Sequence, residues 1–144
     1  MSKNIVTQIQ KELQIILREK SLADSTILAV YIFGSSVTGE EGINSDLDLA
    51  FLLDEKAYKA DPVSALAPSY LAATKVGMKL ERETDVTVLN AASLEMAYEV
   101  VTTGICLFEA DLEKRLEYEA VLRGMYFDFK QFLDDIRSNC IADL

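Results

Sequence analysis

Two short apolar runs, joined by a Gly-Ser pair and an Asp-x-Asp triplet, constrain this chain more than any other feature. Residues 27–33 are almost continuously apolar, and the run ends at the Gly-Ser pair. Ten residues later the Asp-x-Asp triplet opens a second apolar run over residues 46–53. Both runs have the length of a strand, and the first is apolar enough to be buried on both faces. The sequence therefore predicts two strands with polar groups gathered where one ends and the other begins.

The Asp-x-Asp triplet predicts a divalent metal site. Because side chains alternate along a strand, Asp46 and Asp48 project to one side while Leu47 and Leu49 enter the core. Two unpaired carboxylates in one small volume would repel each other, so a divalent cation between them best explains the arrangement. Mg²⁺ takes a few carboxylates together with water and phosphate oxygens, which makes a nucleotide the expected remaining ligand. The alternative is that both aspartates are polar residues on an exposed strand end.

The Gly-Ser pair predicts a phosphate-binding turn. Gly34 allows a sharp turn and close approach of a ligand, and the Ser35 hydroxyl and following amides can donate to phosphate oxygens. Alternatively, Ser35 only caps a short helix over residues 36–39. Ser45 is a further candidate, since it can donate to the first carboxylate, although a loop serine needs no such role. No Gly-x-x-x-x-Gly-Lys-[Ser/Thr] motif is present, which excludes a P-loop.

The charge balance argues against a nucleic-acid partner. The chain has 14 basic and 24 acidic residues, a net charge of −10, and no concentrated basic patch is evident. A basic protein partner is compatible with this sign, as is having no such partner. Because there is no histidine, chemistry must rest on carboxylates and on metals that prefer oxygen ligands.

Length and hydropathy predict one cytoplasmic domain. A chain of 144 residues suits a single domain over 1–144, with half of its residues hydrophobic. No run of 18 apolar residues and no signal-peptide core is present, so we expect no membrane association and a cytoplasmic location. Cys106 and Cys140 are too few and too far apart in sequence for a zinc site or a disulfide framework, which predicts reduced thiols.

The remaining hydrophobic periodicity predicts four helices and two more strands. Pro62 and Pro68 favour helix starts, so the second helix is expected to begin late or to kink, after a break in the pattern over residues 54–61. Lys75 and Arg82 are weaker candidates for phosphate contacts. The expected elements are a helix over 3–20, a helix within 62–81, a strand over 83–89, a helix from about 91 to 102, a strand over 104–108 and a long helix from 111.

The long C-terminal helix carries a wide apolar face. Two adjacent rows make up this face, and its width exceeds what one small domain obviously needs, so it is either core or a partner-binding surface. The first row is Leu112, Leu116, Leu122, Tyr126, Phe129, Leu133 and Ile136, and the second is Tyr118, Val121, Met125 and Phe132.

Gly34-Ser35 and Asp46-x-Asp48, at this spacing between two strands, resemble the signature of the DNA polymerase β-like nucleotidyltransferase superfamily. The short length resembles its minimal nucleotidyltransferase (MNT) branch. The resemblance implies an α/β (α+β) fold, a small mixed sheet flanked by helices with a long C-terminal helix. It also implies that Asp85, on the strand over 83–89, is a third catalytic carboxylate, and that two Mg²⁺ ions and ATP take part. An acceptor hydroxyl would then attack the α-phosphate and pyrophosphate would leave.

The C-terminal pattern adds a softer resemblance. Residues 108–111, Tyr118-Glu119 and residues 126–129 look like the C-terminal helix of MNT antitoxins that partner HEPN-domain ribonuclease toxins. This implies an antitoxin that transfers AMP from ATP to a tyrosine of the toxin, with the helix over about 111–140 as a candidate partner-binding element. Many relatives carry basic residues after Gly-Ser where this chain has residues 36–38, Ser-Val-Thr. Two alternatives stay open: a small-molecule, aminoglycoside-type nucleotidyltransferase, and a non-catalytic antitoxin that acts by binding.

Overall fold

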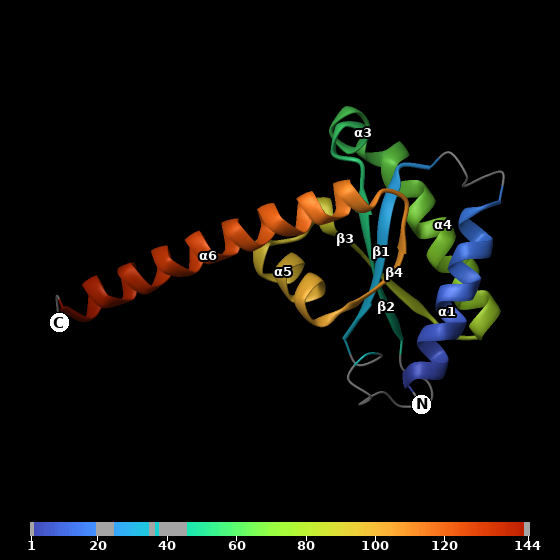
Figure 1. Ribbon diagram of the computed structural model, residues 1–144, viewed down its shortest axis with the longest axis horizontal. Helices are drawn as coiled ribbons and strands as arrows, with labels where there is room; N and C mark the ends of the chain where they lie inside the picture. The colour runs from blue at the N-terminus through green and yellow to red at the C-terminus, as the bar shows by residue number, and fades with distance from the viewer. Residues whose placement is uncertain (1, 20–24, 35–36, 38–45, 143–144) are drawn as a thin grey trace.

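A four-stranded mixed sheet forms the centre of the computed structural model, which describes residues 2–19, 25–34, 37 and 46–142. The strand order is β3-β2-β1-β4 (Figure 1). β1 pairs antiparallel with both β2 and β4, whereas β2 pairs parallel with β3, so the mixed sheet expected from the resemblance is confirmed. The strands are β1 (Ile27–Phe33), β2 (Leu47–Leu53), β3 (Thr84–Val88) and β4 (Ile105–Glu109).

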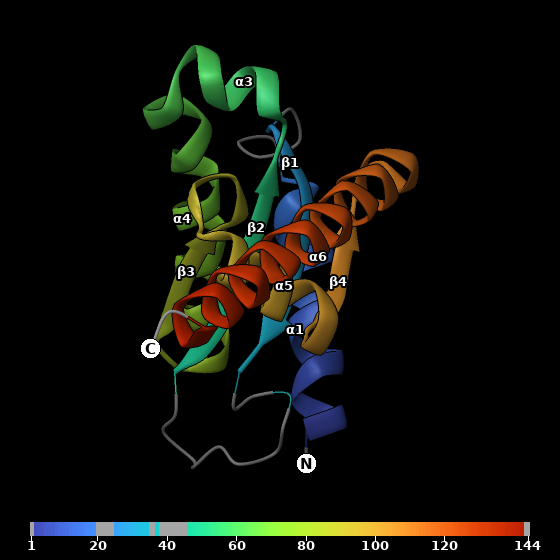
Figure 2. The same ribbon diagram turned by 90° about the vertical axis from the view of Figure 1, so that its left-hand side faces the viewer.

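Helices cover both faces of this sheet. α1 and α4 lie side by side on one face, and α5 with the first part of α6 lies on the other (Figures 1 and 2). No helix in the described part of the chain is long and apolar enough to cross a membrane. The helices are α1 (Ser2–Leu17), α3 (Glu55–Ala60), α4 (Pro62–Leu80), the 3-10 turn η1 (Leu89–Ala91), α5 (Leu94–Thr103) and α6 (Leu112–Ala142).

Strand alternation divides the core into two layers. On β2, Leu47 and Leu49 pack into the layer beneath α1 and α4, whereas Ala50 and Leu52 pack into the layer beneath α5. All four are buried. β2 is therefore apolar on both faces except near its start, where Asp48 lies on the α5 side of the sheet.

The segment after β2 differs from the sequence prediction. The expected break over 54–61 is wrong, because Asp54 caps α3 by accepting from the Ala57 amide at 3.1 Å. Asp61 then caps α4 by accepting from the Ser64 amide at 3.3 Å, and α4 begins directly at Pro62 rather than late. Proline suits this first helical position, where its missing N–H has no intrahelical partner to lose. The predicted short helix over 36–39 and loop over 40–44 lie outside the described residues, apart from residue 37.

α6 is fixed to the sheet by a polar cluster rather than by the whole predicted apolar row. The Tyr31 hydroxyl donates to Glu119 at 2.7 Å, and Arg115 donates to both Glu119 and Glu109 at 2.5 Å. Burial and the nearby Glu119 raise the pKa of Tyr31, so its hydroxyl stays a donor. Leu112 and Leu116, assigned to the apolar face from sequence, are instead 52% and 50% exposed. The i, i+4 Arg-Glu spacing was the overlooked signal of the polar contact.

The turn after β1 requires glycine. Gly34 has φ +75°, in the left-handed region, and its carbonyl accepts from the Val37 amide at 3.1 Å. A Cβ added at Gly34 would lie 2.5 Å from Oδ2 of Asp48. The predicted sharp turn at Gly34 is therefore confirmed, and the neighbour that the glycine approaches is the second aspartate of the Asp-x-Asp triplet. The approach of a ligand to this turn stays a prediction.

Gly34→Ala should destabilise the protein by about 1–3 kcal/mol, because alanine strains at this φ and its methyl group collides with the Asp48 carboxylate. Gly124→Ala is the matched control: its added Cβ meets no atom, so in mid-helix it should stabilise by about 0.5–1 kcal/mol. Urea titration followed by circular dichroism measures both. Equal stability of Gly34→Ala and wild type would contradict the tight turn.

Candidate active site

The sheet register places the predicted site residues at one end of three neighbouring strands. Because β1 and β2 are antiparallel, Phe33 at the end of β1 lies opposite Asp48 near the start of β2. Because β2 and β3 are parallel, Asp48 also lies beside Asp85. Gly34 directly follows β1 and Asp46 directly precedes β2. Four of the six predicted site residues thus meet at the same edge of the sheet.

The three aspartates share an electrostatic environment. Asp46 and Asp85 are exposed, whereas Asp48 is partly buried between the neighbouring strands. Burial raises the pKa of Asp48 above its usual value, and the negative charges of Asp85 and then Asp46 raise it further. These carboxylates are therefore close enough to repel one another, which is the condition that a bound cation would relieve.

The donor set fits a divalent cation that prefers oxygen ligands. Asp46, Asp48 and Asp85 supply only carboxylate oxygens, as Mg²⁺ favours, and the added repulsion on Asp48 gives a cation an electrostatic role. Within the described ranges, however, no three acidic, histidine or cysteine side chains are already grouped closely enough to hold a metal ion. A metal with its own water and phosphate ligands would have to draw the exposed Asp46 and Asp85 together.

The structure tests only some of the remaining candidate contacts to phosphate or to Asp46. Ser35 and Ser45 lie outside the described residues, so their predicted roles stay predictions. Lys75 belongs to α4, on the sheet face opposite Asp48, and forms an ion pair with Glu19. This placement removes Lys75 from the site. Arg82 lies just before β3, at the end of the sheet where Asp46 lies, and stays a candidate.

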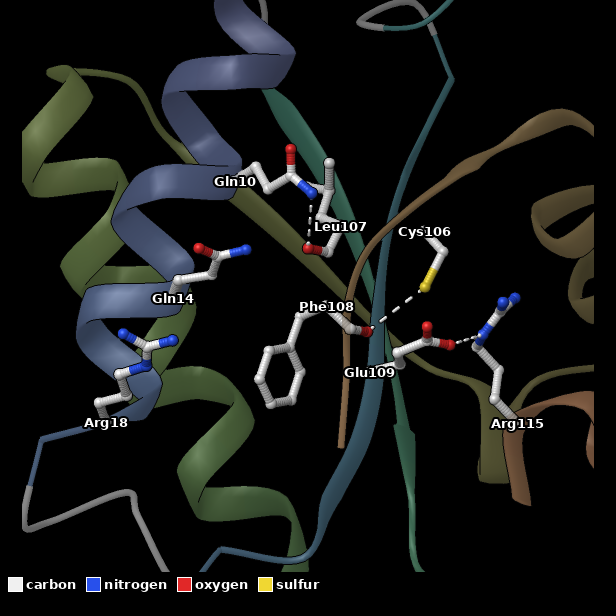
Figure 3. Close-up of a pocket in the computed structure, with 8 residues that line it drawn as sticks. All are labelled: Gln10, Gln14, Arg18, Cys106, Leu107, Phe108, Glu109 and Arg115. Carbon is white, nitrogen blue, oxygen red and sulfur yellow. Dashed lines mark hydrogen bonds and ion pairs between the residues drawn. The ribbon is translucent and has the colours of Figure 1, made fainter. Parts of the chain in front are cut away.

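A polar cavity of about 370 Å³ lies elsewhere, between α1 and the outer edge of β4 (Figure 3). Its polar groups already serve the fold, since Gln10 donates to the Leu107 carbonyl at 3.4 Å and Arg115 pairs with Glu109. The Cys106 thiol donates to the Phe108 carbonyl at 3.4 Å, and burial raises its pKa, which disfavours the reactive thiolate. None of the predicted site residues lines this cavity, so we do not assign the active site to it.

Replacing Asp48 should stabilise the metal-free protein at neutral pH. The folded-state pKa of Asp48 is raised, so the folded chain loses stability as pH rises through that pKa and Asp48 ionises beside two other carboxylates. Asp48→Asn should therefore melt at a higher temperature than wild type at pH 7 in EDTA, and the difference should shrink as the pH falls toward the unfolded-state value of 3.8.

The control for this comparison is Asp128→Asn, at an exposed position on α6. It should leave the pH dependence of the melting temperature unchanged. Added Mg²⁺ should stabilise wild type more than Asp48→Asn, because the variant lacks one of the carboxylate ligands. A lower melting temperature for metal-free Asp48→Asn at pH 7 would contradict the repulsion.

Comparisons with known structures find the fold of this chain in chains from toxin–antitoxin structures. A chain from a crystal structure of a toxin–antitoxin with AMP-PNP superposes with a TM-score of 0.65 at 23% identity, covering 92% of this chain and 98% of that one. A chain of the MntA–HepT pair gives 0.58 at 21% identity, with coverages of 92% and 97%. A structure of the tri-AMPylated Shewanella oneidensis HEPN toxin in complex with MNT antitoxin gives 0.57 at 20% identity, with 92% and 98%.

These likenesses establish a shared fold, including the long C-terminal helix. Comparison with curated proteins gives no significant match. The sequence itself matches the family model for polymerase beta, nucleotidyltransferase, over residues 7–113, which spans the whole sheet and every candidate site residue. The chain therefore belongs to the polymerase beta nucleotidyltransferase family.

Proposed function

We propose that this protein is an antitoxin that transfers AMP from ATP to a tyrosine hydroxyl of a HEPN-type toxin and thereby silences the toxin. The observation that carries this proposal is the register of β1, β2 and β3, which brings Gly34, Asp48 and Asp85 to one edge of the sheet. Family membership supports the nucleotidyl transfer. The choice of acceptor is supported by structural neighbours, one of which is described as an AMPylated HEPN toxin in complex with MNT antitoxin.

In this proposal the chain contributes mainly positioning. Asp46, Asp48 and Asp85 would hold Mg²⁺, which neutralises triphosphate charge when bound. Gly34 leaves room for the Asp48 carboxylate, because a Cβ at this position would lie 2.5 Å from Oδ2 of Asp48, so the turn that would receive the triphosphate lies directly against a proposed metal ligand. The backbone amides that follow it, with the Ser35 hydroxyl, are the proposed donors to the phosphate oxygens, and Ser45 is the proposed donor to Asp46.

The exposed Asp85 is the proposed acceptor of the proton from the incoming tyrosine hydroxyl. The hydroxyl oxygen bonds to the α-phosphorus, the bond from that phosphorus to the bridging oxygen breaks, and pyrophosphate leaves with the electron pair. The toxin tyrosine then carries one AMP. Because the described part of the chain has no histidine or reactive thiol near the site, carboxylates are the groups available for proton transfer.

A second candidate function is neutralisation by binding alone. It is favoured by one observation, that the described carboxylates are not already grouped as a metal cluster. The intact aspartates and the glycine fitted against Asp48 favour the catalytic function. A small-molecule acceptor stays an alternative as well.

The test is intact mass spectrometry of a HEPN-type partner that is co-expressed with this protein. The partner is incubated with the protein, Mg²⁺ and ATP, and in parallel with the Asp46→Ala/Asp48→Ala variant or with EDTA. We expect the partner to gain the mass of one AMP or a small multiple, located on tyrosine by fragmentation, and the gain to be absent in both controls.

Two results would contradict the catalytic proposal. Neutralisation of the toxin without any mass change would leave an antitoxin that acts by binding. Absence of both binding and mass change would favour a small-molecule acceptor instead.

A further inference from the structure

The outer part of α6 extends beyond the rest of the protein. The helix has 31 residues, or about 46 Å at the usual rise per residue. Its first part packs against the body: Leu122 is buried, and the Tyr126 ring stacks on Tyr98 with centroids 3.7 Å apart. Past Tyr126 the helix projects away from the sheet and the other helices (Figure 1). In the view turned by 90° this part of α6 lies in front of the sheet, toward the viewer (Figure 2).

An apolar seam continues along this projecting part. This seam follows the same helix face that packs on the body of the protein. Its residues are spaced alternately four and three positions apart, which is the heptad repeat of coiled coils. A second apolar row flanks it, in which Met125 is 55% and Phe132 is 60% exposed. We call these two rows the distal seam: Phe129, Leu133, Ile136 and Cys140, flanked by Met125 and Phe132.

The other flank of the distal seam is basic. Arg123, Lys130 and Arg137 recur every seven residues, each directly after a seam position, so they form one row along the helix. Arg123 and Arg137 are exposed, at 50% and 72% of their side chains, and each forms a long ion pair within the helix, 3.5 Å to Glu119 and 4.0 Å to Asp134. In a chain of net charge −10 this positive row is a local exception.

The charge pattern argues against binding of a second copy of this chain to the distal seam. An antiparallel pair of α6 helices would bring the two basic rows together, and like charges at such flanking positions repel. A parallel pair would place each basic row against the apolar row of Met125 and Phe132, where the charges gain no partner. Complementarity instead requires acidic residues opposite the basic row.

We propose that the distal seam docks an amphipathic α-helix of a partner protein, whose acidic residues, spaced seven apart, lie against Arg123, Lys130 and Arg137. The apolar row on the other flank widens the contact, so the partner helix, or a second helix beside it, covers Met125 and Phe132. That this partner is the HEPN-type toxin rests on the proposed function. The docking surface is then separate from the catalytic edge of the sheet, so partner binding and AMP transfer are assigned to different residues.

The first test uses synthetic helices and the full-length protein. The probe is a 28-residue peptide of four heptads (about the length of α6), with leucine in the seam and glutamate on both flanks, and its counterpart carries lysine on the flanks. Fluorescence anisotropy should detect binding of the glutamate peptide only, weakening as salt is added. The charge reversal Lys130→Glu/Arg137→Glu should weaken this binding at least tenfold, whereas Gln131→Glu/Ser138→Glu, which adds negative charge on the opposite face, should change it less than twofold.

The second test uses the HEPN-type partner itself. Lys130→Glu/Arg137→Glu should raise the KM for partner AMPylation at least tenfold with little change in kcat, because the catalytic carboxylates are untouched. Asp46→Ala/Asp48→Ala should do the reverse, binding the partner with wild-type affinity while transferring nothing. Failure of AMP transfer with intact seam-dependent binding would overturn the proposed function and leave the docking proposal standing.

Two results would overturn the docking proposal. One is equal binding of the glutamate and lysine peptides, or binding of neither. The other is sedimentation of the protein alone as a dimer that Phe129→Lys converts to a monomer, which would make a second copy the occupant of the distal seam. Phe129→Lys lies on the projecting part of α6, so circular dichroism should find its helix content and melting temperature close to those of wild type.

Discussion

The pairing of β2 with two different neighbours is the constraint on which the rest of the structure depends. The antiparallel pairing with β1 brings the end of one strand to the beginning of the next, and the parallel pairing with β3 adds a third strand start at the same edge. A shift of one residue would turn Asp48 into the core beneath α1 and α4 and would take Leu47 and Leu49 out of that layer to the α5 side. Burial of the leucines therefore fixes the register, and the register gathers the carboxylates.

The proposed catalytic site and the proposed docking surface lie on different parts of the molecule. Where β1 ends and β2 begins, Gly34 packs against the carboxylate of Asp48, whose pKa is raised by burial and by its acidic neighbours. Grouping these charges lowers the stability of the metal-free fold, as is common at functional sites. On the α5 side, the buried Glu119 is held by Tyr31 and Arg115 and orients α6. These hydrogen bonds in the first half of α6 fix the direction of the helix, so that the distal seam extends away from the sheet. In the proposed complex, a partner helix binds it there.

Much of this arrangement could be predicted from the sequence because local patterns encode it. Apolar runs and the Gly-Ser and Asp-x-Asp spacing predicted β1, β2 and the glycine turn, and strand alternation placed Asp46 and Asp48 opposite Leu47. The capped helix α3 was missed because its six residues carry no amphipathic period, only the Asp54 cap. The exposed Leu112 was misassigned because the way α6 faces the sheet depends on the hydrogen bond from Tyr31 to Glu119, and these two residues are 88 positions apart in sequence.

In the proposed function, Asp46, Asp48 and Asp85 bind a metal together with a nucleotide. The most direct measurement is anomalous diffraction from crystals of the protein grown with Mn²⁺, which shares the oxygen preference of Mg²⁺, and a non-hydrolysable ATP analogue. This proposal requires an anomalous peak between the carboxylates of Asp46 and Asp48, with Asp85 beside it and the triphosphate against Gly34. A nucleotide bound elsewhere, or bound at this edge with no metal peak near these carboxylates, would contradict it.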